Sequence, residues 1–200
     1  LDVTKIVLDL DVSHTTDVYG IGVTNDGTYA SVRINDGSSP TDKIKNIENI
    51  QGSGGDDTIY GNGENNTIYG MGGNDTIYGV AGDNYIDGGD GDDLIYSGTG
   101  TDLLLGSNGN DTFRATSASS FASDIIDGGN EVDTSLNVLG RGSDTVDYSL
   151  VSTTGFTEGV NVTLASGTDS IVTINTSNSH VIKNIENIIG TSHNDSIVGD

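Results

Sequence analysis

Residues 52–114 read "GSGGDDTIY GNGENNTIY GMGGNDTIY GVAGDNYID GGDGDDLIY SGTGTDLLL GSNGNDTFR". The stretch repeats every nine residues, and each rung of nine has glycine and polar residues in most of its first six positions. The sixth position is Asp or Asn, and the eighth is a large apolar residue. A three-residue strand buries only its middle side chain, and glycines allow the positive φ of a tight turn. Each rung therefore predicts a turn followed by a short strand, so that two rungs make one coil of a solenoid.

The eighth positions predict the core of this solenoid. They are Ile59, Ile68, Ile77, Ile86, Ile95, Leu104 and Phe113. Less regular rungs extend the pattern as "SSFASDIID" (119–127), "GGNEVDTSL" (128–136) and "LGRGSDTVD" (139–147). Residues 115–118 break the phase of the repeat, which predicts a bulge or loop at that point.

The composition favours disorder unless a cation is bound. Of the 200 residues, 30 are acidic and 7 are basic, the formal net charge is −23, and only 32% of the residues are hydrophobic. Burial in so polar a chain does not offset the loss of chain entropy while the acidic groups repel one another. The chain has no cysteine, which excludes disulfides and thiolate metal sites. Its charge makes nucleic acid and anionic membrane surfaces poor partners, and no apolar run is long enough to span a membrane.

A longer repeat overlies the rungs, and we call it the long repeat. The segment "IKNIENIQGSGGDDTIYG" (44–61) returns near the end of the chain as "IKNIENIIGTSHNDSIVG" (182–199). Alternating, hairpin-like sequence accompanies both copies, as "GTYASVRIN" (27–35) and "GVNVTLASGTDSIVTIN" (159–175). The expected organisation is a strand-rich capping segment at 1–51, a solenoid at 52–147, a second strand-rich segment at 148–189 and the start of a further solenoid at 190–200.

The rungs follow the pattern GGxGxDxUx, and the chain resembles the repeats-in-toxin (RTX) family, whose nonapeptides bind calcium. The resemblance implies an all-β fold, namely a calcium-bound parallel β-roll with flanking antiparallel strand-rich segments. It also implies several Ca²⁺ ions, held by sixth-position side chains and turn carbonyls, which are the oxygen ligands that calcium prefers. The implied metal-binding residues are Asp57, Asn66, Asp75, Asn84, Asp93, Asp102, Asp111, Asp124, Asp133, Asp144 and Asp195 at sixth positions, Gly55, Gly73, Gly82, Gly91, Gly100 and Gly109 at fourth positions, and Asp56, Asn74 and Asp92 at fifth positions.

The two edges of the expected roll differ in charge. Rungs that are two apart share an edge, so the turns before Ile59, Ile77, Ile95 and Phe113 form what we call the odd edge, and those before Ile68, Ile86 and Leu104 the even edge. The sixth positions are all Asp on the odd edge, whereas two of the three on the even edge are Asn. An amide brings no charge, so we expect weaker calcium binding along the even edge.

Other metals fit the residues less well. Mg²⁺ demands a tighter octahedral geometry, and Zn²⁺ prefers nitrogen and sulfur ligands, of which this chain offers only three histidines. His193 replaces a turn glycine and is expected to be a degenerate turn residue, while His14 and His180 are expected at the surface.

The RTX resemblance implies a structural module of a secreted bacterial protein, exported by a type I system and located outside the cell or on its surface. A large adhesin or exoprotein is the favoured parent, and the expected partners are calcium and neighbouring repeats of the same chain. Two alternatives stay open, an accessory module of a secreted polysaccharide-active enzyme such as an epimerase, and glycan binding by Tyr60, Tyr78 and Tyr96. Catalysis is not expected, because the carboxylates are repetitive and neither cysteine nor a GxSxG motif occurs.

Overall fold

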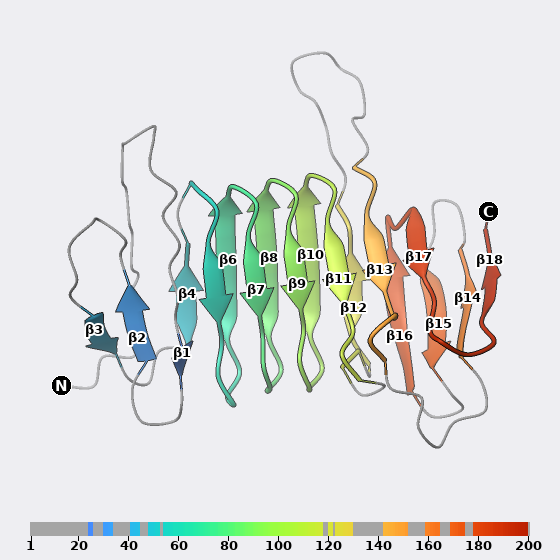
Figure 1. Cartoon of the computed structure of the whole chain (residues 1–200), viewed down its shortest axis with the longest axis horizontal. Helices are drawn as coiled ribbons and strands as arrows, with labels where there is room; N and C mark the ends of the chain where they lie inside the picture. Colours follow the sequence, from blue (N-terminus) through green and yellow to red (C-terminus); the bar gives the residue numbers. More distant parts are fainter. Residues whose placement is uncertain are drawn as a thin grey trace, which may run out of the picture.

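The computed structural model describes residues 24–25, 30–33, 41–44, 48–52, 54–117, 120–121, 123–129, 142–151, 159–164, 169–174 and 178–199. In these ranges every regular element is a β-strand, and the strands form three sheets (Figure 1). This part of the chain accordingly contains no helix that could cross a membrane.

Two sheets of parallel strands face each other and form a β-roll, as the sequence predicted. The first contains β5 (Thr58–Tyr60), β7 (Thr76–Tyr78), β9 (Leu94–Tyr96), β11 (Thr112–Arg114), β13 (Thr145–Asp147) and β17 (Asn187–Ile189) in this order. The second contains β4 (Asn49–Gln51), β6 (Thr67–Gly72), β8 (Tyr85–Asp90), β10 (Leu103–Asn108), β12 (Ile125–Asp127) and β16 (Asn178–Lys183). Figure 1 shows these strands stacked along the longest axis of the molecule.

The register follows the nine-residue period. Ile59 pairs with Ile77 and Ile77 with Ile95, while Ile68 pairs with Ile86 in the opposite sheet. Each strand therefore pairs with the strand two rungs later, and one coil takes two rungs in the regular part of the roll. The turns of the odd edge connect the second sheet to the first, and those of the even edge return the chain.

The core is the double column of eighth-position side chains. The seven residues from Ile59 to Phe113 at these positions are all 0% exposed. Val146 and Ile126 continue the two columns and are also fully buried. Each such side chain contributes roughly 1.5–3 kcal/mol by leaving water, so the thin core rests on one column of apolar side chains for each sheet.

The phase break lies where the sequence placed it, since the chain bends at Thr116 and Ser117 between β11 and β12. Beyond it the coils are longer than two rungs and unequal in length. Ile126 pairs with Leu104 in the second sheet, and Val146 pairs with Phe113 in the first. The stack of strands nevertheless continues without a gap in either sheet.

The second copy of the long repeat adds strands to the same roll. β16 pairs in parallel with β12, and β17 pairs in parallel with β13. β15 (Ser170–Ile174) and β14 (Val160–Thr163) then form an antiparallel meander with β16, and β18 (Ser196–Val198) pairs in parallel with β14. A separate antiparallel sheet at the other end holds β1 (Thr24–Asn25), β2 (Ala30–Arg33) and β3 (Thr41–Ile44). The division into four segments stays a prediction, but the strands from residue 178 onward extend the sheets of the first roll.

The expectation that His180 lies at the surface is wrong. Its side chain is only 3% exposed, and its Nε2 lies 2.6 Å from the hydroxyl oxygen of Tyr148. Side chains alternate along β16, and His180 falls on the inward face together with Ile182. Phe121 packs against both rings, so this aromatic cluster closes the core where the long coils begin. His193 is exposed in a turn, as expected, and His14 lies outside the described residues.

Candidate calcium sites

The sixth-position side chains of the odd edge form one buried column. Asp57, Asp75, Asp93, Asp111 and Asp144 are between 0% and 3% exposed. Each carboxylate after the first accepts the backbone N–H of the sixth-position residue one coil earlier. The nitrogen-to-oxygen distance is 2.7 Å from Asp57 to Asp75, 2.8 Å from Asp75 to Asp93, 2.9 Å from Asp93 to Asp111 and 2.8 Å from Asp111 to Asp144. These bonds use Oδ1 only.

The even edge repeats this arrangement with a different composition. The N–H of Asn66 donates to Oδ1 of Asn84 at 2.9 Å, that of Asn84 to Asp102 at 2.7 Å, and that of Asp102 to Asp124 at 2.8 Å. All four side chains are buried. The two edges therefore share a backbone design and differ in which sixth-position side chains carry a carboxylate.

In five of these aspartates the second carboxylate oxygen has no protein donor. Among the described residues, Oδ2 is buried without a hydrogen-bond partner in Asp75, Asp93, Asp102, Asp111 and Asp124. A buried acceptor without a partner costs about 1–3 kcal/mol, and more when it carries charge. These five oxygens mark positions at which a cation would relieve a large penalty.

Burial also raises the pKa of these carboxyl groups. Loss of hydration, partly offset by the N–H bond, raises the pKa of Asp75, Asp111 and Asp124 to about 8. The same causes raise the pKa of Asp93 to about 7 and that of Asp102 to about 6. Neighbouring carboxylates in the column add to the effect in Asp75 and Asp111. Without a counter-charge, the column therefore favours protonated carboxyl groups near neutral pH.

First-position glycines make room for oxygen atoms around these carboxylates. A methyl group on Gly70 would collide both with Oδ2 of Asp75 and with the carbonyl oxygen of Gly88 in the next coil. The same pair of oxygens recurs one coil later at Gly88, which faces Asp93 and the carbonyl oxygen of Gly106. The odd edge thus brings a carboxylate oxygen and a main-chain carbonyl together at each of these coils.

This donor set fits calcium. Ca²⁺ takes several carboxylate and carbonyl oxygens in flexible geometry. Among the described residues, no three acidic or histidine side chains converge on one point, so side chains alone do not complete a site. A cation at the odd edge would therefore need the sixth-position carboxylates together with turn carbonyls, and the individual ligands stay a prediction.

One turn of the even edge supplies its own donor. The amide nitrogen of Asn84 lies 3.1 Å from the carbonyl oxygen of Gly82 and 3.4 Å from that of Ala81. This amide occupies carbonyls that a calcium ion would need. Asn66 differs, because its amide nitrogen donates to the side chain of Asn62 at 3.3 Å. The structure therefore gives a physical reason to expect weak calcium binding at Asn84.

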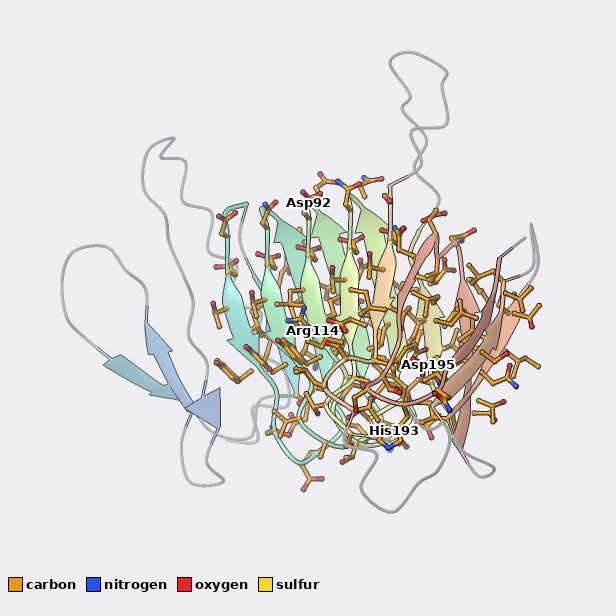
Figure 2. All side chains as sticks on the ribbon, turned by 45° about the vertical axis from the view of Figure 1, so that its right-hand side comes forward. Asp92, Arg114, His193 and Asp195 are labelled. Atoms are coloured by element: carbon orange, nitrogen blue, oxygen red, sulfur yellow. The ribbon has the colours of Figure 1, made fainter. Side chains whose placement is uncertain are left out.

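The fifth positions form a second ladder that the sequence did not reveal. Oδ1 of Asp56 accepts the N–H of Asn74 at 2.7 Å, Oδ1 of Asn74 accepts that of Asp92 at 3.0 Å, and Oδ1 of Asp92 accepts that of Asn110 at 2.8 Å. These side chains lie at the edge of the roll, where Figure 2 shows Asp92. The fifth-position bonds run from later to earlier coils, opposite to the sixth-position bonds, so neighbouring coils between Asp56 and Asn110 are joined by hydrogen bonds in both directions.

The fourth-position glycines carry the turn itself. Gly73, Gly82, Gly91, Gly100 and Gly109 all have positive φ, between 87° and 147°. At Gly91 a side chain would also collide with the carbonyl oxygen of Gly73. Stacking of one turn on the next thus needs glycine for both conformation and space. Gly55, at the first coil, has no atom within 4 Å of the position of a Cβ.

The remaining sixth positions lie in different settings. Asp195 accepts N–H bonds from Thr191 and Val160, both at 2.9 Å, and so ties β18 to β14. Asp133 lies outside the described residues. In the first sheet, the strand that pairs with β11 on its later side is β13, which follows Asp144. Glu186 was not predicted, although its Oε2 accepts the N–H of Asp144 at 3.0 Å and so prolongs the odd column. Glu186 occupies the sixth position of residues 181–189, and this position could have predicted its place in the column.

The tyrosines stack on each other. The ring centroids of Tyr60 and Tyr78 are 4.5 Å apart with 3° between the planes, and those of Tyr78 and Tyr96 are 4.6 Å apart at 10°. Arg114 ends the row with a hydrogen bond to the Tyr96 hydroxyl and an ion pair with Asp147 at 2.8 Å. Figure 2 shows Arg114 on the face of the strands. Because the facing rings cover each other, this ladder stabilises the stack of coils.

Comparison with known proteins identifies the repeats. Residues 46–77 and 78–113 match the family model of the RTX calcium-binding nonapeptide repeat. Among solved structures, the chain is similar to the AlgE6R3 subunit of the mannuronan C5-epimerase from Azotobacter vinelandii, with 25% identity over 66% of this chain and 72% of that one and a TM-score of 0.24. No curated protein matches the sequence. Residues 46–113 are therefore RTX calcium-binding nonapeptide repeats, folded as part of a parallel β-roll.

Proposed function

We propose that this chain is a structural module of a secreted bacterial protein and that it folds when calcium binds outside the cell. The main support is the set of buried Oδ2 atoms without a donor, which includes those of Asp75 and Asp111, whose carboxyl groups have raised pKa values. An ionised column of this kind is unstable by itself, because burial removes hydration and the neighbouring charges repel. Calcium ions between coils convert each repulsion into attraction.

The proposal accounts for the composition of the chain. With a net charge of −23 and no cysteine, the chain has neither charge balance nor a disulfide to keep it compact. A ligand that binds only the folded state stabilises it by RT ln(1 + [L]/Kd), which is roughly 1.4 kcal/mol for each site at about tenfold excess. Several sites together switch a marginal domain between states. Such a chain stays unfolded where free calcium is scarce, which suits export through a type I system, and folds where calcium is abundant.

The repetitive environment of the carboxylates supports a structural role. General acid and base catalysis needs carboxyl groups in distinct surroundings. On the odd edge, each carboxylate after Asp57 accepts one N–H from the preceding coil, and all of them are buried. A large adhesin or exoprotein suits the module best, because the long repeat supplies strands at both ends of the roll. The alternative parent is a polysaccharide-active enzyme with an RTX accessory module. A catalytic domain next to this segment would favour the enzyme, and further copies of the long repeat would favour the adhesin.

A glycan ligand for the tyrosine ladder has less support. Stacking of a sugar on an aromatic side chain requires an open ring face. Tyr78 has a neighbouring ring on both faces, at 4.5 Å and 4.6 Å. The stabilising role therefore accounts for the ladder without a ligand.

A calcium titration tests the proposal. Protein freed of metal by chelation should give the circular dichroism spectrum of a disordered chain, and added calcium should convert it cooperatively into a β spectrum. Magnesium is the matched control, because its octahedral preference does not suit these carbonyl-rich turns. A β spectrum that persists in chelator at neutral pH would overturn the proposal.

A further inference from the structure

The last two strands are copies of the first two strands of the roll. In the alignment of the long repeat, β17 (Asn187–Ile189) corresponds to β4 (Asn49–Gln51), and β18 (Ser196–Val198) corresponds to β5 (Thr58–Tyr60). Their neighbours differ. β4 and β5 pair with the strands that follow them, β6 and β7, whereas β17 and β18 pair with the preceding strands β13 and β14. The equivalent strands of the two copies therefore form their hydrogen bonds along opposite edges: β4 and β5 toward later strands, and β17 and β18 toward earlier ones.

The hydrogen bonds of β17 and β4 do not compete. The N–H of Asn187 donates to the carbonyl of Asp144 at 2.9 Å, and the carbonyl of Ile189 accepts from Tyr148 at 2.8 Å. In the other copy, the carbonyl of Glu48 accepts from Thr67 and the N–H of Gly52 donates to Tyr69, both at 2.7 Å. Because N–H and C=O groups of successive residues in a strand point to opposite edges, one strand can make both sets at once.

The same holds for β18 and β5. The carbonyl of Val198 accepts from Leu164 at 2.9 Å. In β5 the carbonyl of Asp57, which corresponds to Asp195, accepts from Thr76 at 2.8 Å. The residues of the two sets again alternate along the strand. The edge of β18 that faces away from β14 therefore presents the groups that β5 uses to bind β7.

Burial of equivalent side chains points the same way. Ile59 is 0% exposed in β5 because later coils cover it, whereas its copy Ile197 is 43% exposed. All three residues of β18 are exposed, and β18 is the last strand of its sheet in the described part of the chain. An apolar side chain and the outer edge of a sheet lie together at this end, which is the combination that another β-structure covers.

The first strands of the roll, β4 and β5, have features that match this end. Glu186 accepts the N–H of Asp144 and so closes the odd column of the roll before it. Its copy is Glu48, which lies half-buried in front of β4. β1 aligns with part of β14 in the long repeat. It contacts β5, just as β14 pairs with β18, the copy of β5. The first strands of the roll thus have the residues needed to end a preceding roll.

We propose that β17 and β18 form a docking face for a further copy of the long repeat, and that β4, β5 and Glu48 receive the end of a preceding copy. Tandem units would then share these strands and form one uninterrupted solenoid. The first sheet of one unit, which ends in β17, continues as the second sheet of the next, because β17 is equivalent to β4. The sheet that ends in β18 continues as the first. At every junction, the first sheet of one unit thus becomes the second sheet of the next, and the second becomes the first. The antiparallel strands β14 to β16 belong to the sheet that ends in β18.

Hydrogen exchange in a two-unit chain tests this junction. The protein consists of residues 1–200 followed directly by residues 63–200, and it is compared in calcium with the single chain. The amides of Ile188 and Ile197 point away from β13 and β14, so they should exchange at least about tenfold more slowly in the two-unit chain. The amide of Asn187 already pairs with Asp144 and should be protected in both proteins.

Two variants of the two-unit chain sharpen the test. Ile197→Asp places a charge where the copied residue is fully buried and should abolish the added protection, whereas Val198→Asp places the same charge on the outer face and should retain it. In the single chain Ile197 is partly exposed, so the substitution should leave its calcium-dependent β spectrum unchanged, which separates a failed junction from failed calcium folding. Rapid exchange of both amides in a two-unit chain with two folded rolls would overturn the proposal.

Discussion

Protons should replace calcium in stabilising this roll. In the metal-free protein the buried carboxyl groups prefer the neutral form, because burial raises their pKa. The unfolded chain has the ordinary value of 3.8 for these groups, while the folded chain has about 8 for Asp75, Asp111 and Asp124, about 7 for Asp93 and about 6 for Asp102. A group with a raised folded pKa contributes stability below its unfolded pKa and loses it as the pH rises through the folded value.

The magnitude follows from the number of protons. Around pH 5 the folded state holds these five protons and the unfolded state, with a pKa of 3.8 for each group, has released nearly all of them. His180 opposes them with one proton, because burial lowers its pKa from 6.5 to about 3 and only the unfolded state is protonated at this pH. A net difference of about four protons makes the free energy of unfolding fall by roughly 5 kcal/mol per pH unit. Domains of this size have only about 5–15 kcal/mol in total, so calcium-free protein should fold at the acidic end and unfold near neutrality.

The assay is urea unfolding in buffers freed of calcium by a resin, from about pH 4.5 to 8, followed by circular dichroism. The urea midpoint should fall steadily as the pH rises, and saturating calcium should remove most of this dependence. The matched control is the triple variant Asp75→Asn, Asp93→Asn, Asp111→Asn, which imitates the protonated column. It should keep a β spectrum without calcium at the upper end of the range. A calcium-free midpoint that stays level or rises with pH would refute the reasoning.

Three further substitutions examine the turns and the core. Gly91→Ala should raise the calcium midpoint of folding strongly, because Gly91 has φ +130° and no space for a methyl group, whereas Gly63→Ala, with nothing within 4 Å, should change it little. Ile77→Asp buries a charge at a fully buried position and should prevent folding or require far more calcium, so an unchanged midpoint would mean a wrong register. Asn84→Asp removes the amide that bonds Gly82 and adds a carboxylate, so calorimetry should detect additional bound calcium, and an unchanged stoichiometry would show that the even edge is limited by something else.

Much of the roll could be predicted from the sequence because its period and its geometry coincide. A nine-residue rung leaves one residue in three of each strand facing inward, so the eighth positions had to form the core, and Ile59, Ile77 and Ile95 pair directly. The sixth positions followed from the same phase. The predictions became less complete beyond Arg114, since the coils there differ in length and no fixed period connects Phe113 to Val146.

The role of the second copy of the long repeat could not be predicted from its own residues. The sequence of β17 equals that of β4 at two of three positions, yet β17 pairs backward and β4 forward. Which edge of a strand is used depends on the neighbours that the rest of the chain brings to it. His180 is a similar case, because only the pairing of β16 with β15 and β12 places its side chain inside.

The two asparagines of the even edge show most clearly what a motif leaves undetermined. Asn66 and Asn84 occupy the same position of adjacent coils, and the N–H of the first donates to the side chain of the second. In the turn before Asn66, the second-position residue is Asn62, whose side-chain oxygen accepts the amide of Asn66. The corresponding residue before Asn84 is Val80, whose side chain has no acceptor, so the amide of Asn84 turns to the carbonyl of Gly82. The amide of Asn84 therefore takes turn carbonyls that a cation would need, whereas the amide of Asn66 bonds a side chain instead, although the sixth position reads the same in both rungs.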